Sequence, residues 1–516
     1  MNFTDADIKE ITAHGLTPEQ VDEQVDLFIN GVPNVVLEDA ATTKKGILKL
    51  NKDQKARYIK LYKDYKEELD VIKFTPASGA ASRMFKSVYQ FLADYDPKKE
   101  KLKDYLKGKD SKFLDRFFDK YKDFPFYKEV MSRVKEKYSK EQLDDKSFKK
   151  YAFVETMMAS DEFDFGSDPK GLLPFHNYDG TLVTAFEEHL YEAAAYAQQH
   201  KHAKLHFTVS PEHKEGFEKL FSEIESRVSE ATGTKFHVSY SFQKPETDTV
   251  AVTEDNKLYR KPDGKLLFRP GGHGALINNL NDIDADIIFI KNIDNVLTQD
   301  NLDSLSRNKK MLAGILLELQ EQVFEYAELL SKDKITPAQI EKLKIFLENG
   351  FSLGLREDYE RLSPKEKKEY LFDLINRPIR VCGMVKNEGE PGGGPFFVKD
   401  KNGKVSLQII ESAQVNFDDK QQGEIFKQST HFNPVDVVAG VRDFKRDKFD
   451  LEKFVNPDLA FIASKTDNGT PIKALELPGL WNGAMAKWNT IFVEVPVKTF
   501  NPVKTINDLL KPSHQA

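Results

Sequence analysis

Hydrophobic residues recur at intervals of three and four over several long stretches of the chain, and this spacing predicts amphipathic helices. Near the N-terminus the pattern covers residues 18–30 and 55–68. It returns over residues 96–160, where Lys, Asp, Phe and Tyr are frequent, and again over residues 299–374. Much of the chain is therefore expected to be helical.

Short apolar runs between these stretches predict β-strands. They cover residues 71–74, 204–210, 235–240, 287–290, 379–385, 407–410, 435–440 and 491–495. The almost continuous apolar run at 287–290 is typical of a strand buried on both faces, as in a parallel sheet. The alternation of strands and helices predicts an α/β fold with a central mixed sheet.

Three parts of the chain can be separated by pattern. Residues 1–69 are predicted to form an N-terminal helical segment. Residues 70–440 would form the main α/β domain, with helical insertions at about 87–165 and 299–374, and residues 441–516 a smaller C-terminal segment. The first insertion is compatible with a lid over a ligand or with a solvated helical decoration.

Composition narrows the class of protein. Of 516 residues, 40% are hydrophobic and 31% are charged, which is typical of a soluble globular protein. The net charge of −7 gives no field that would favour nucleic acid or an anionic membrane. Cys382 is the only cysteine, so a disulfide within the chain and a cysteine-built zinc site are excluded. With no signal peptide or membrane span in the pattern, we expect a cytoplasmic protein without nucleic-acid or membrane partners.

A turn of small residues directly follows the strand at 71–74. Small side chains allow backbone N–H groups to approach a phosphate, and Arg83 follows where a guanidinium could hold phosphate oxygens. The turn residues predicted to contact a nucleotide are Ala77, Ser78, Gly79 and Ala80. A tight connection without a ligand is the alternative.

Two later segments each contribute one lysine as a candidate phosphate ligand. Lys170 follows Pro169 and Lys504 lies within residues 500–510. Either lysine alone is equally compatible with an ordinary surface position.

Two further segments suggest contact with a base and with a metal ion. Residues 269–276 contain three glycines, and Gly272 and His273 lie among them. Asp294 follows the buried strand at 287–290, and ligands of open α/β sheets bind at such strand ends. A carboxylate there can hold Mg²⁺, which prefers oxygen ligands, or it can simply cap a turn.

Taken in order, these segments resemble the UDP-sugar pyrophosphorylase group, which includes UDP-glucose and UDP-N-acetylhexosamine pyrophosphorylases. The late Phe-x-Pro-Val-Lys-x-x-x-Asp-Leu-Leu motif is the most specific match. The matching pieces are residues 78–83, 169–170, 242–274, 292–295, 411–414 and 500–510. The resemblance implies a nucleotide-diphospho-sugar transferase (GT-A-like, Rossmann-like) domain. It also implies a Mg²⁺-dependent reaction of a nucleoside triphosphate, with UTP favoured, and a sugar 1-phosphate to give a nucleotide sugar and pyrophosphate.

The same resemblance implies roles for individual residues. Arg83 and Lys170 would hold the departing pyrophosphate, Lys504 would contact the sugar phosphate or α-phosphate, and Asp294 would hold Mg²⁺. The base and ribose would contact Gln243, Gly272 and His273, and the sugar would contact Glu411 and Asn433. The C-terminal segment would complete the sugar-phosphate site.

The chain departs from this family pattern in four places. Ala81 stands where a second glycine is usual, and Ala275 follows the glycine segment where Asp or Gly is common. A long helical stretch separates Arg83 from Pro169, and the glycine loop at 388–395 matches no family element. These departures concern the choice of nucleotide and sugar more than the class of reaction.

Two other functions fit the same sequence. One is a glycosyltransferase that consumes a nucleotide sugar, with residues 292–295 as its acidic metal-binding segment. The other is a protein that binds a nucleotide or nucleotide sugar without catalysis. The Pro-Lys segment and the late lysine motif, which belong to pyrophosphorylases, stand against the glycosyltransferase.

Overall fold

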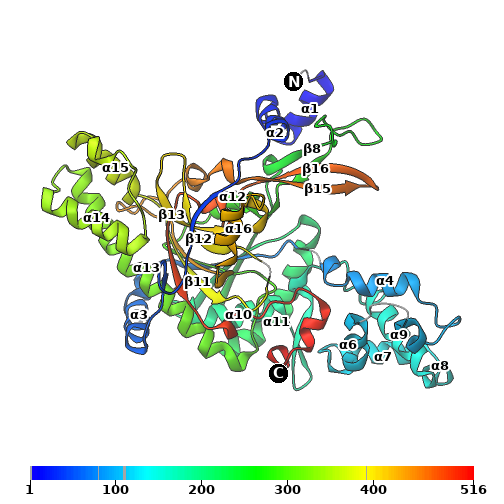
Figure 1. The fold of residues 1–516 in the computed structure, drawn as a ribbon. Helices are drawn as coiled ribbons and strands as arrows, with labels where there is room; N and C mark the ends of the chain where they lie inside the picture. Colours follow the sequence, from blue (N-terminus) through cyan, green and yellow to red (C-terminus); the bar gives the residue numbers. More distant parts are fainter. Residues whose placement is uncertain (1–2, 80, 108–111, 391, 516) are drawn as a thin grey trace. The chain divides into compact units, whose positions relative to one another are not determined.

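The computed structural model describes residues 3–79, 81–107, 112–390 and 392–515. Figure 1 shows the ribbon coloured along the sequence. Contacts within the chain divide it into two compact units. Unit 1 comprises Met1–Phe74, Ser241–Ile290 and Arg307–Val497, and unit 2 comprises Thr75–Tyr240, Lys291–Ser306 and Lys498–Ala516. The two units are described separately below.

The largest sheet has eight strands in the order β2-β17-β11-β14-β10-β3-β6-β7. Their bounds are β2 (Ile47–Leu48), β17 (Asn489–Glu494), β11 (Ile379–Lys386), β14 (His431–Gly440), β10 (Ile287–Ile290), β3 (Val71–Pro76), β6 (His202–Thr208) and β7 (Lys235–Ser241). β10 is parallel to β3 and β11 is parallel to β17, whereas β14 is antiparallel to both β10 and β11. The expected α/β class with a central mixed sheet is confirmed.

Burial explains why the central strands of unit 1 could be recognised. All four residues of β10 and all ten residues of β14 are buried. Strands covered on both faces are mostly apolar, and this produces the continuous hydrophobic run of β10. β14 also buries the polar residues His431, Asn433 and Asp436. Two smaller sheets accompany these strands in unit 1, with strand orders β1-β12-β13 and β15-β16-β8-β9. Their bounds are β1 (Val36–Ala40), β12 (Gly394–Lys399), β13 (Val405–Ile410), β15 (Phe461–Asp467), β16 (Thr470–Glu476), β8 (Asp248–Val252) and β9 (Phe268–Pro270).

The N-terminal segment contains the expected helices and also two strands. The helices are α1 (Asp5–Ala13), α2 (Pro18–Asn30) and α3 (Lys52–Tyr65), and each begins with a capping box. β1 pairs with β12 and β2 with β17. Local spacing did not predict these strands because their partners lie hundreds of residues away in the sequence.

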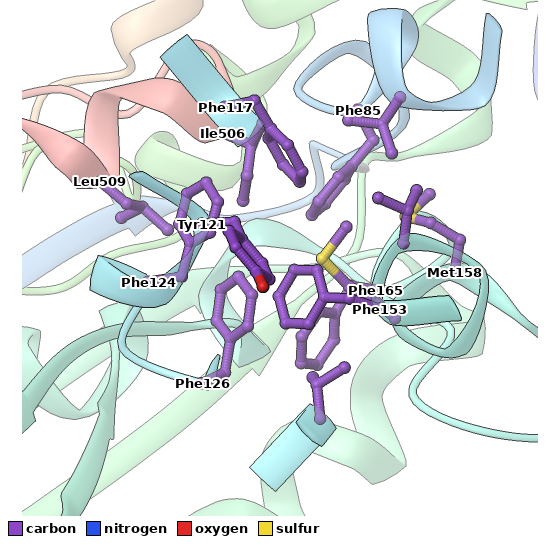
Figure 2. Packing of buried hydrophobic residues seen from close by; sticks show 14 of the residues in the cluster. Phe85, Phe117, Tyr121, Phe124, Phe126, Phe153, Met158, Phe165, Ile506 and Leu509 are labelled. Carbon is purple, nitrogen blue, oxygen red and sulfur yellow. The ribbon is translucent and has the colours of Figure 1, made fainter. Parts of the chain in front are cut away.

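The first helical insertion belongs to unit 2, and its buried side chains form one hydrophobic cluster with Val503, Ile506 and Leu509 near the C-terminus. Its helices are α4 (Lys86–Asp94), α5 (Leu102–Lys107), α6 (Lys112–Lys120), α7 (Tyr127–Lys137), α8 (Lys140–Asp144) and α9 (Lys146–Met158). Aromatic side chains dominate this core, as Figure 2 shows around Phe117, Tyr121 and Phe153. Phe117 and Phe153 are fully buried. The helices of the insertion therefore form a packed bundle.

Two further helices of unit 2 pack against β6. They are α10 (Ala185–Tyr196) and α11 (Lys214–Thr232), and they share a core with Leu205 and Phe207 of that strand. The second predicted insertion corresponds to α13 (Leu302–Ser331), α14 (Pro337–Phe351) and α15 (Pro364–Ile375). Across the described ranges, no helix has the length and hydrophobicity of a membrane span.

Replacing Phe153 by alanine tests how far the insertion depends on its aromatic core. We expect Phe153→Ala to lower the free energy of unfolding by about 3–5 kcal/mol, because a buried ring is replaced by a cavity. Urea unfolding followed by circular dichroism measures this. Phe417→Ala is the matched control, because that ring is 48% exposed. Equal stability of the two variants would contradict the role given to this core.

Candidate phosphate and sugar sites

Asp294 of unit 2 follows the end of β10 by four residues. The backbone N–H of Ile293 donates to the carbonyl of Pro76 at 3.4 Å, and the N–H of Asn295 donates to the carbonyl of Asn292 at 3.2 Å. These bonds turn the chain after the strand. Ile293 is buried in the core shared by α10, α11 and β6. The position of the Asp294 carboxylate is therefore fixed by packed backbone.

Two lysines from distant motifs meet this carboxylate. Lys170 Nζ lies 2.8 Å from Asp294 Oδ2, and Lys504 Nζ lies 3.4 Å from the same oxygen. Lys170 also donates to the carbonyl of Val503 at 2.7 Å. In sequence, Asp294 is 124 residues from Lys170 and 210 from Lys504. The structure thus brings together three residues that the sequence suggested from three separate segments.

The charges of this group favour an anion. Burial by itself would raise the pKa of Asp294, but the charges of Lys170 and Lys504 outweigh burial and hold that pKa below its usual value. With one carboxylate and two ammonium groups, the formal charge of the group is +1. Lys170 is 14% exposed, whereas Lys504 is 60% exposed and accessible to a ligand. Phosphate oxygens are well suited to such a pair of lysines.

The small-residue turn lies directly beside Lys170. The N–H of Lys170 donates to the carbonyl of Gly79 at 3.4 Å, and the N–H of Ala81 donates to the carbonyl of Asp168 at 3.1 Å. A side chain placed on Gly79 would meet no atom within 4 Å, so the turn is open at this point. The turn and the Pro-Lys segment therefore form one structural element.

The individual predictions for this turn have different outcomes. The Ala77 N–H donates to the carbonyl of Thr208 at 2.8 Å, so the sheet already uses this amide. The carbonyl of Ser78 accepts from Ser210 Oγ at 3.4 Å. Arg83 is exposed and forms no ion pair with any residue that the structure describes. Ala80 lies outside the described residues.

These hydrogen bonds also explain the unusual distance between Arg83 and Pro169. The helical insertion lies between Ala81 and Asp168 in the sequence. These two residues are hydrogen-bonded to each other. An insertion whose two ends are joined in this way leaves the geometry of the turn intact. The long separation is therefore compatible with one continuous site.

The backbone around Lys504 is held by Asp294 and Asp508. The N–H of Val503 donates to the carbonyl of Asp294 at 2.9 Å. Asp508 Oδ2 accepts from the backbone N–H groups of Lys504 at 2.9 Å and Thr505 at 2.7 Å. The segment is therefore fixed on both sides of the lysine.

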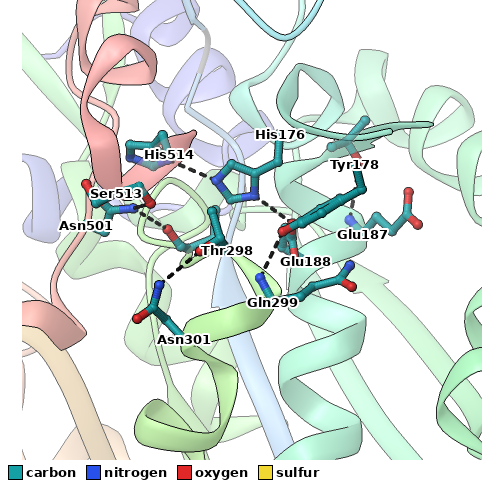
Figure 3. A network of polar contacts seen from close by, with 12 residues as sticks. His176, Tyr178, Glu187, Glu188, Thr298, Gln299, Asn301, Asn501, Ser513 and His514 are labelled. Atoms are coloured by element: carbon teal, nitrogen blue, oxygen red, sulfur yellow. Dashed lines mark hydrogen bonds and ion pairs between the residues drawn. The ribbon is translucent and has the colours of Figure 1, made fainter. Parts of the chain in front are cut away.

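The end of the chain is anchored by a buried histidine pair (Figure 3). His176 Nε2 lies 3.0 Å from His514 Nδ1, and His176 Nδ1 lies 2.6 Å from Glu188 Oε1. Both rings are buried. Asn501 also donates to the carbonyl of Ser513 at 3.0 Å. The C-terminal residues thus close back onto the segment that carries Lys504.

A second group of predicted residues lies in unit 1 around His273. Its ring stacks on Trp481 with centroids 4.4 Å apart, and Nδ1 accepts from the N–H of Leu480 at 3.0 Å. Burial lowers the pKa of His273, although Glu411 and Glu476 act in the opposite direction. Neutral His273 is therefore favoured at neutral pH.

In this group, the absence of a side chain on Gly272 allows the Glu476 carboxylate to lie close to the backbone. Gly272 has a φ of +76°, and a side chain there would come within 2.3 Å of Glu476 Oε2. The predicted sugar ligand Glu411 accepts from Asn482 Nδ2 at 2.7 Å. Trp481 and Asn482 belong to no motif found in the sequence, and the only signal for them is a short segment at 477–483 that is rich in Gly, Pro and Trp.

Gly393, from the glycine loop that matches no family element, also lies close to Glu411. A side chain on Gly393 would lie 3.6 Å from both Asn482 Oδ1 and Glu411 Cγ. The carbonyl of Gly393 accepts from the N–H of Asn433 at 2.8 Å. Among the described residues, Asn433 Nδ2 is buried without a hydrogen-bond partner. Gln243 makes a different contact, with its Nε2 donating to Asp248 Oδ1 at 3.4 Å.

The donor set suits Mg²⁺ only together with a phosphate ligand. No group of three or more His, Cys, Asp or Glu side chains in the described part of the chain is placed to hold a metal ion. Asp294 alone supplies one carboxylate. Mg²⁺ commonly uses one or two carboxylates, with substrate phosphates and water as its other ligands. The residues present therefore fit a Mg²⁺ ion that arrives with a phosphorylated substrate.

The fold is that of a mixed α/β protein, and comparison with protein families identifies the family of the chain. The chain belongs to the family described as Domain of unknown function (DUF4301), whose model matches residues 4–515. No curated protein matches the chain.

Solved structures with a similar arrangement include two nucleotide-sugar enzymes. UDP-glucose pyrophosphorylase from Leishmania major, solved in open and closed forms, is 12% identical with a TM-score of 0.44. The match covers 99% of this chain and 79% of that one. Uridine diphosphate N-acetylglucosamine pyrophosphorylase from Trypanosoma brucei, in complex with an inhibitor, is also 12% identical with a TM-score of 0.47. That match covers 98% of this chain and 82% of the other.

Removing the charge of Asp294 tests the energetics of the two lysines. We expect Asp294→Asn to lower the free energy of unfolding at pH 7 by on the order of 3 kcal/mol, because Lys170 would keep a largely buried charge without its partner. Because the folded-state pKa of Asp294 is lowered, its contribution is present above the unfolded pKa and is lost as pH falls through the folded value. The difference from wild type should therefore shrink in acid. Urea unfolding at neutral and acidic pH measures it, with exposed Asp300→Asn as control.

Replacing His514 tests the buried histidine pair. Burial lowers the pKa of His514 to about 3, and the charge of His176 acts in the same direction. The unfolded chain therefore takes up a proton more readily, and stability should fall as pH decreases from about 6.5 towards 3. We expect His514→Gln to reduce this slope by up to about 1.4 kcal/mol per pH unit. Urea unfolding at pH 7, 6 and 5 measures the slope, and parallel lines for wild type and variant would contradict the expectation.

Proposed function

We propose that this protein transfers a nucleotidyl group from a nucleoside triphosphate, with UTP favoured, to a sugar 1-phosphate, releasing pyrophosphate. The observation that carries the proposal is the meeting of Lys170 and Lys504 at one oxygen of Asp294. The family resemblance implies phosphate-binding roles for the two lysines and a metal-binding role for Asp294. A net positive group beside an open turn supports binding of a polyphosphate.

The proposed reaction needs no protein nucleophile. A phosphate oxygen of the sugar 1-phosphate is largely ionised near neutral pH, since the second pKa of such a phosphate is about 6. This oxygen forms a bond to the α-phosphorus of the triphosphate. The bond from that phosphorus to the bridging oxygen of the β-phosphate breaks, and pyrophosphate leaves with the electron pair. Catalysis then rests on positioning and on charge neutralisation.

The residues of unit 2 receive roles that fit this chemistry. Lys170, held by Asp294 and by the carbonyl of Val503, would contact the departing pyrophosphate. Lys504, whose side chain is the more exposed of the two lysines, would contact the α-phosphate or the sugar phosphate. Exposed Arg83 is free of ion pairs with the described residues and would add a further contact to pyrophosphate. Asp294 would be the protein ligand of Mg²⁺, which supplies charge neutralisation on the phosphates when bound.

The residues of unit 1 keep the roles that the family resemblance implies. Gly272, His273 and Gln243 are proposed to contact the base and ribose. Glu411 and Asn433 are proposed to contact sugar hydroxyls, and the buried Asn433 Nδ2, which has no partner among the described residues, is a donor suited to that task.

An assay of pyrophosphate release tests the proposal directly. Purified protein is incubated with Mg²⁺, each common nucleoside triphosphate and a panel of sugar 1-phosphates. We expect pyrophosphate only when one triphosphate and one sugar phosphate are both present. Nucleotide binding without release from any pair would favour a non-catalytic protein, and consumption of a nucleotide sugar with transfer of its sugar would favour a glycosyltransferase.

Lys504→Ala should lower turnover by on the order of 10²–10³-fold, because one preorganised positive charge at the reacting phosphate is removed. Lys498→Ala is the matched control, since Lys498 is an exposed lysine six residues earlier. Circular dichroism checks that both variants are folded. A Lys504→Ala variant with the turnover of the control would exclude Lys504 from the mechanism.

A further inference from the structure

The segment that carries Lys504 is part of the hydrophobic core of the helical insertion. Val503, Ile506 and Leu509 are fully buried, and they belong to the same cluster as Phe117, which lies in α6. Figure 2 shows Ile506 and Leu509 among the aromatic rings of the insertion. Lys504 therefore lies between two side chains that are buried in this core, Val503 directly before it and Ile506 two residues after it.

Polar contacts attach the same segment to the insertion at defined points. Asn507 Nδ2 donates to the carbonyl of Phe113 in α6 at 2.8 Å. The N–H of Ile506 donates to the carbonyl of Met84, just before α4, at 3.3 Å. Asn507 is 7% exposed, so its bond to Phe113 is shielded from water. A hydrogen bond in such a place orients the backbone strongly, because a buried group without a partner is costly.

Lys504 itself has little else to fix its side chain. Its side chain is 60% exposed and its contact with Asp294 is the longer of the two ion pairs, at 3.4 Å. A long exposed lysine loses substantial rotamer entropy when it is held in one place. The direction of the side chain therefore depends on the backbone from Val503 to Asn507, and that backbone is held by the insertion on one side and by Asp294 on the other.

We infer that the helical insertion positions Lys504, and that Asn507 and Ile506 are the positioning residues that transmit its packing to the lysine. The inference rests on the proposed function for its effect on turnover, but the position of Lys504 is a separate property of the molecule. The insertion thus contributes to the proposed phosphate site by fixing the position of Lys504. Any change that loosens the bundle near α4 and α6 would also release Lys504.

The test compares two variants that each remove one polar contact of the insertion. Asn507→Ala removes the bond to Phe113, next to Lys504. Tyr138→Phe removes the bond from Tyr138 Oη to Glu155 Oε2 at 2.5 Å, which lies within the insertion and involves no residue of the C-terminal segment. Ile506→Val is a milder second variant, in case Asn507→Ala does not fold.

The first measurement does not require activity. Each protein is treated with an amine-acetylating reagent, and the rates of modification of Lys504 and Lys498 are followed by peptide mass spectrometry. We expect Asn507→Ala to raise the rate of Lys504 relative to Lys498 by at least about threefold, because local opening removes the lysine from Asp294. Tyr138→Phe should leave the ratio unchanged. Equal ratios in wild type, Asn507→Ala and Ile506→Val would overturn the inference.

The second measurement is kinetic. Asn507→Ala should lower kcat by about tenfold or more while the KM for the triphosphate stays within about twofold, because a misplaced lysine weakens the transition state more than binding. Equal losses of kcat in Asn507→Ala and Tyr138→Phe would show a general effect of stability and contradict positioning. If wild type shows no turnover, the proposed function fails and the acetylation ratio alone still decides the position of Lys504.

Discussion

The buried carboxylate of Asp294 and its two lysines are the interaction on which the candidate phosphate site depends. Lys170 and Asp294 are both largely shielded from water, and removing two charges from water is favourable only when they are well paired. The pairing requires the backbone after β10, the Pro-Lys segment and the late lysine motif to meet at one point. Backbone hydrogen bonds join Val503 to Asp294 and Lys170 to the small-residue turn, so the ion pairs close a structure that is already held together.

This constraint explains how unit 2 tolerates a long insertion close to its candidate site. Loop closure costs grow slowly with length, so an insertion with joined ends adds little entropy cost to the site. The bond between Ala81 and Asp168 joins those ends. The aromatic core then gives the inserted residues their own stability, and the burial of Ile506 and Leu509 ties the last segment of the chain to them. The helical insertion is in this way packed against the segment that carries Lys504.

The parts of the fold that could be predicted from sequence are those whose signal is local. β10, most of β11 and residues 435–440 of β14 are recognisable because strands buried on both faces are mostly apolar. The first residues of β14 are not, because buried His431 and Asn433 interrupt the apolar run. β12 was missed because it begins in the glycine loop, and β15 and β16 because their alternating, partly exposed residues give a weak signal. The strands β1 and β2 depend on partners far along the chain. Register and pairing of that kind are tertiary properties, which local spacing does not contain.

The candidate site shows the same division. Lys170, Asp294 and Lys504 were each weak signals, and only their order in the chain suggested a common role. That both lysines share one oxygen, and that the Ala77 amide is used within the sheet, depend on three-dimensional position. Trp481 and Asn482 had no recognisable motif, because contacts with His273 and Glu411 leave no fixed spacing in the sequence.

The shared oxygen also limits how the proposed phosphate site can work. Asp294 forms ion pairs with both lysines, and its negative charge offsets the repulsion between their positive charges. An incoming phosphate must compete with this carboxylate for the ammonium groups. Lys504 is the easier of the two to recruit, because it is more exposed and its ion pair is longer, whereas Lys170 is also bound to the carbonyl of Val503. The geometry thus divides the two lysines into one that stays with the protein and one that can follow the substrate, and in the proposed reaction the second is the one placed at the reacting phosphate.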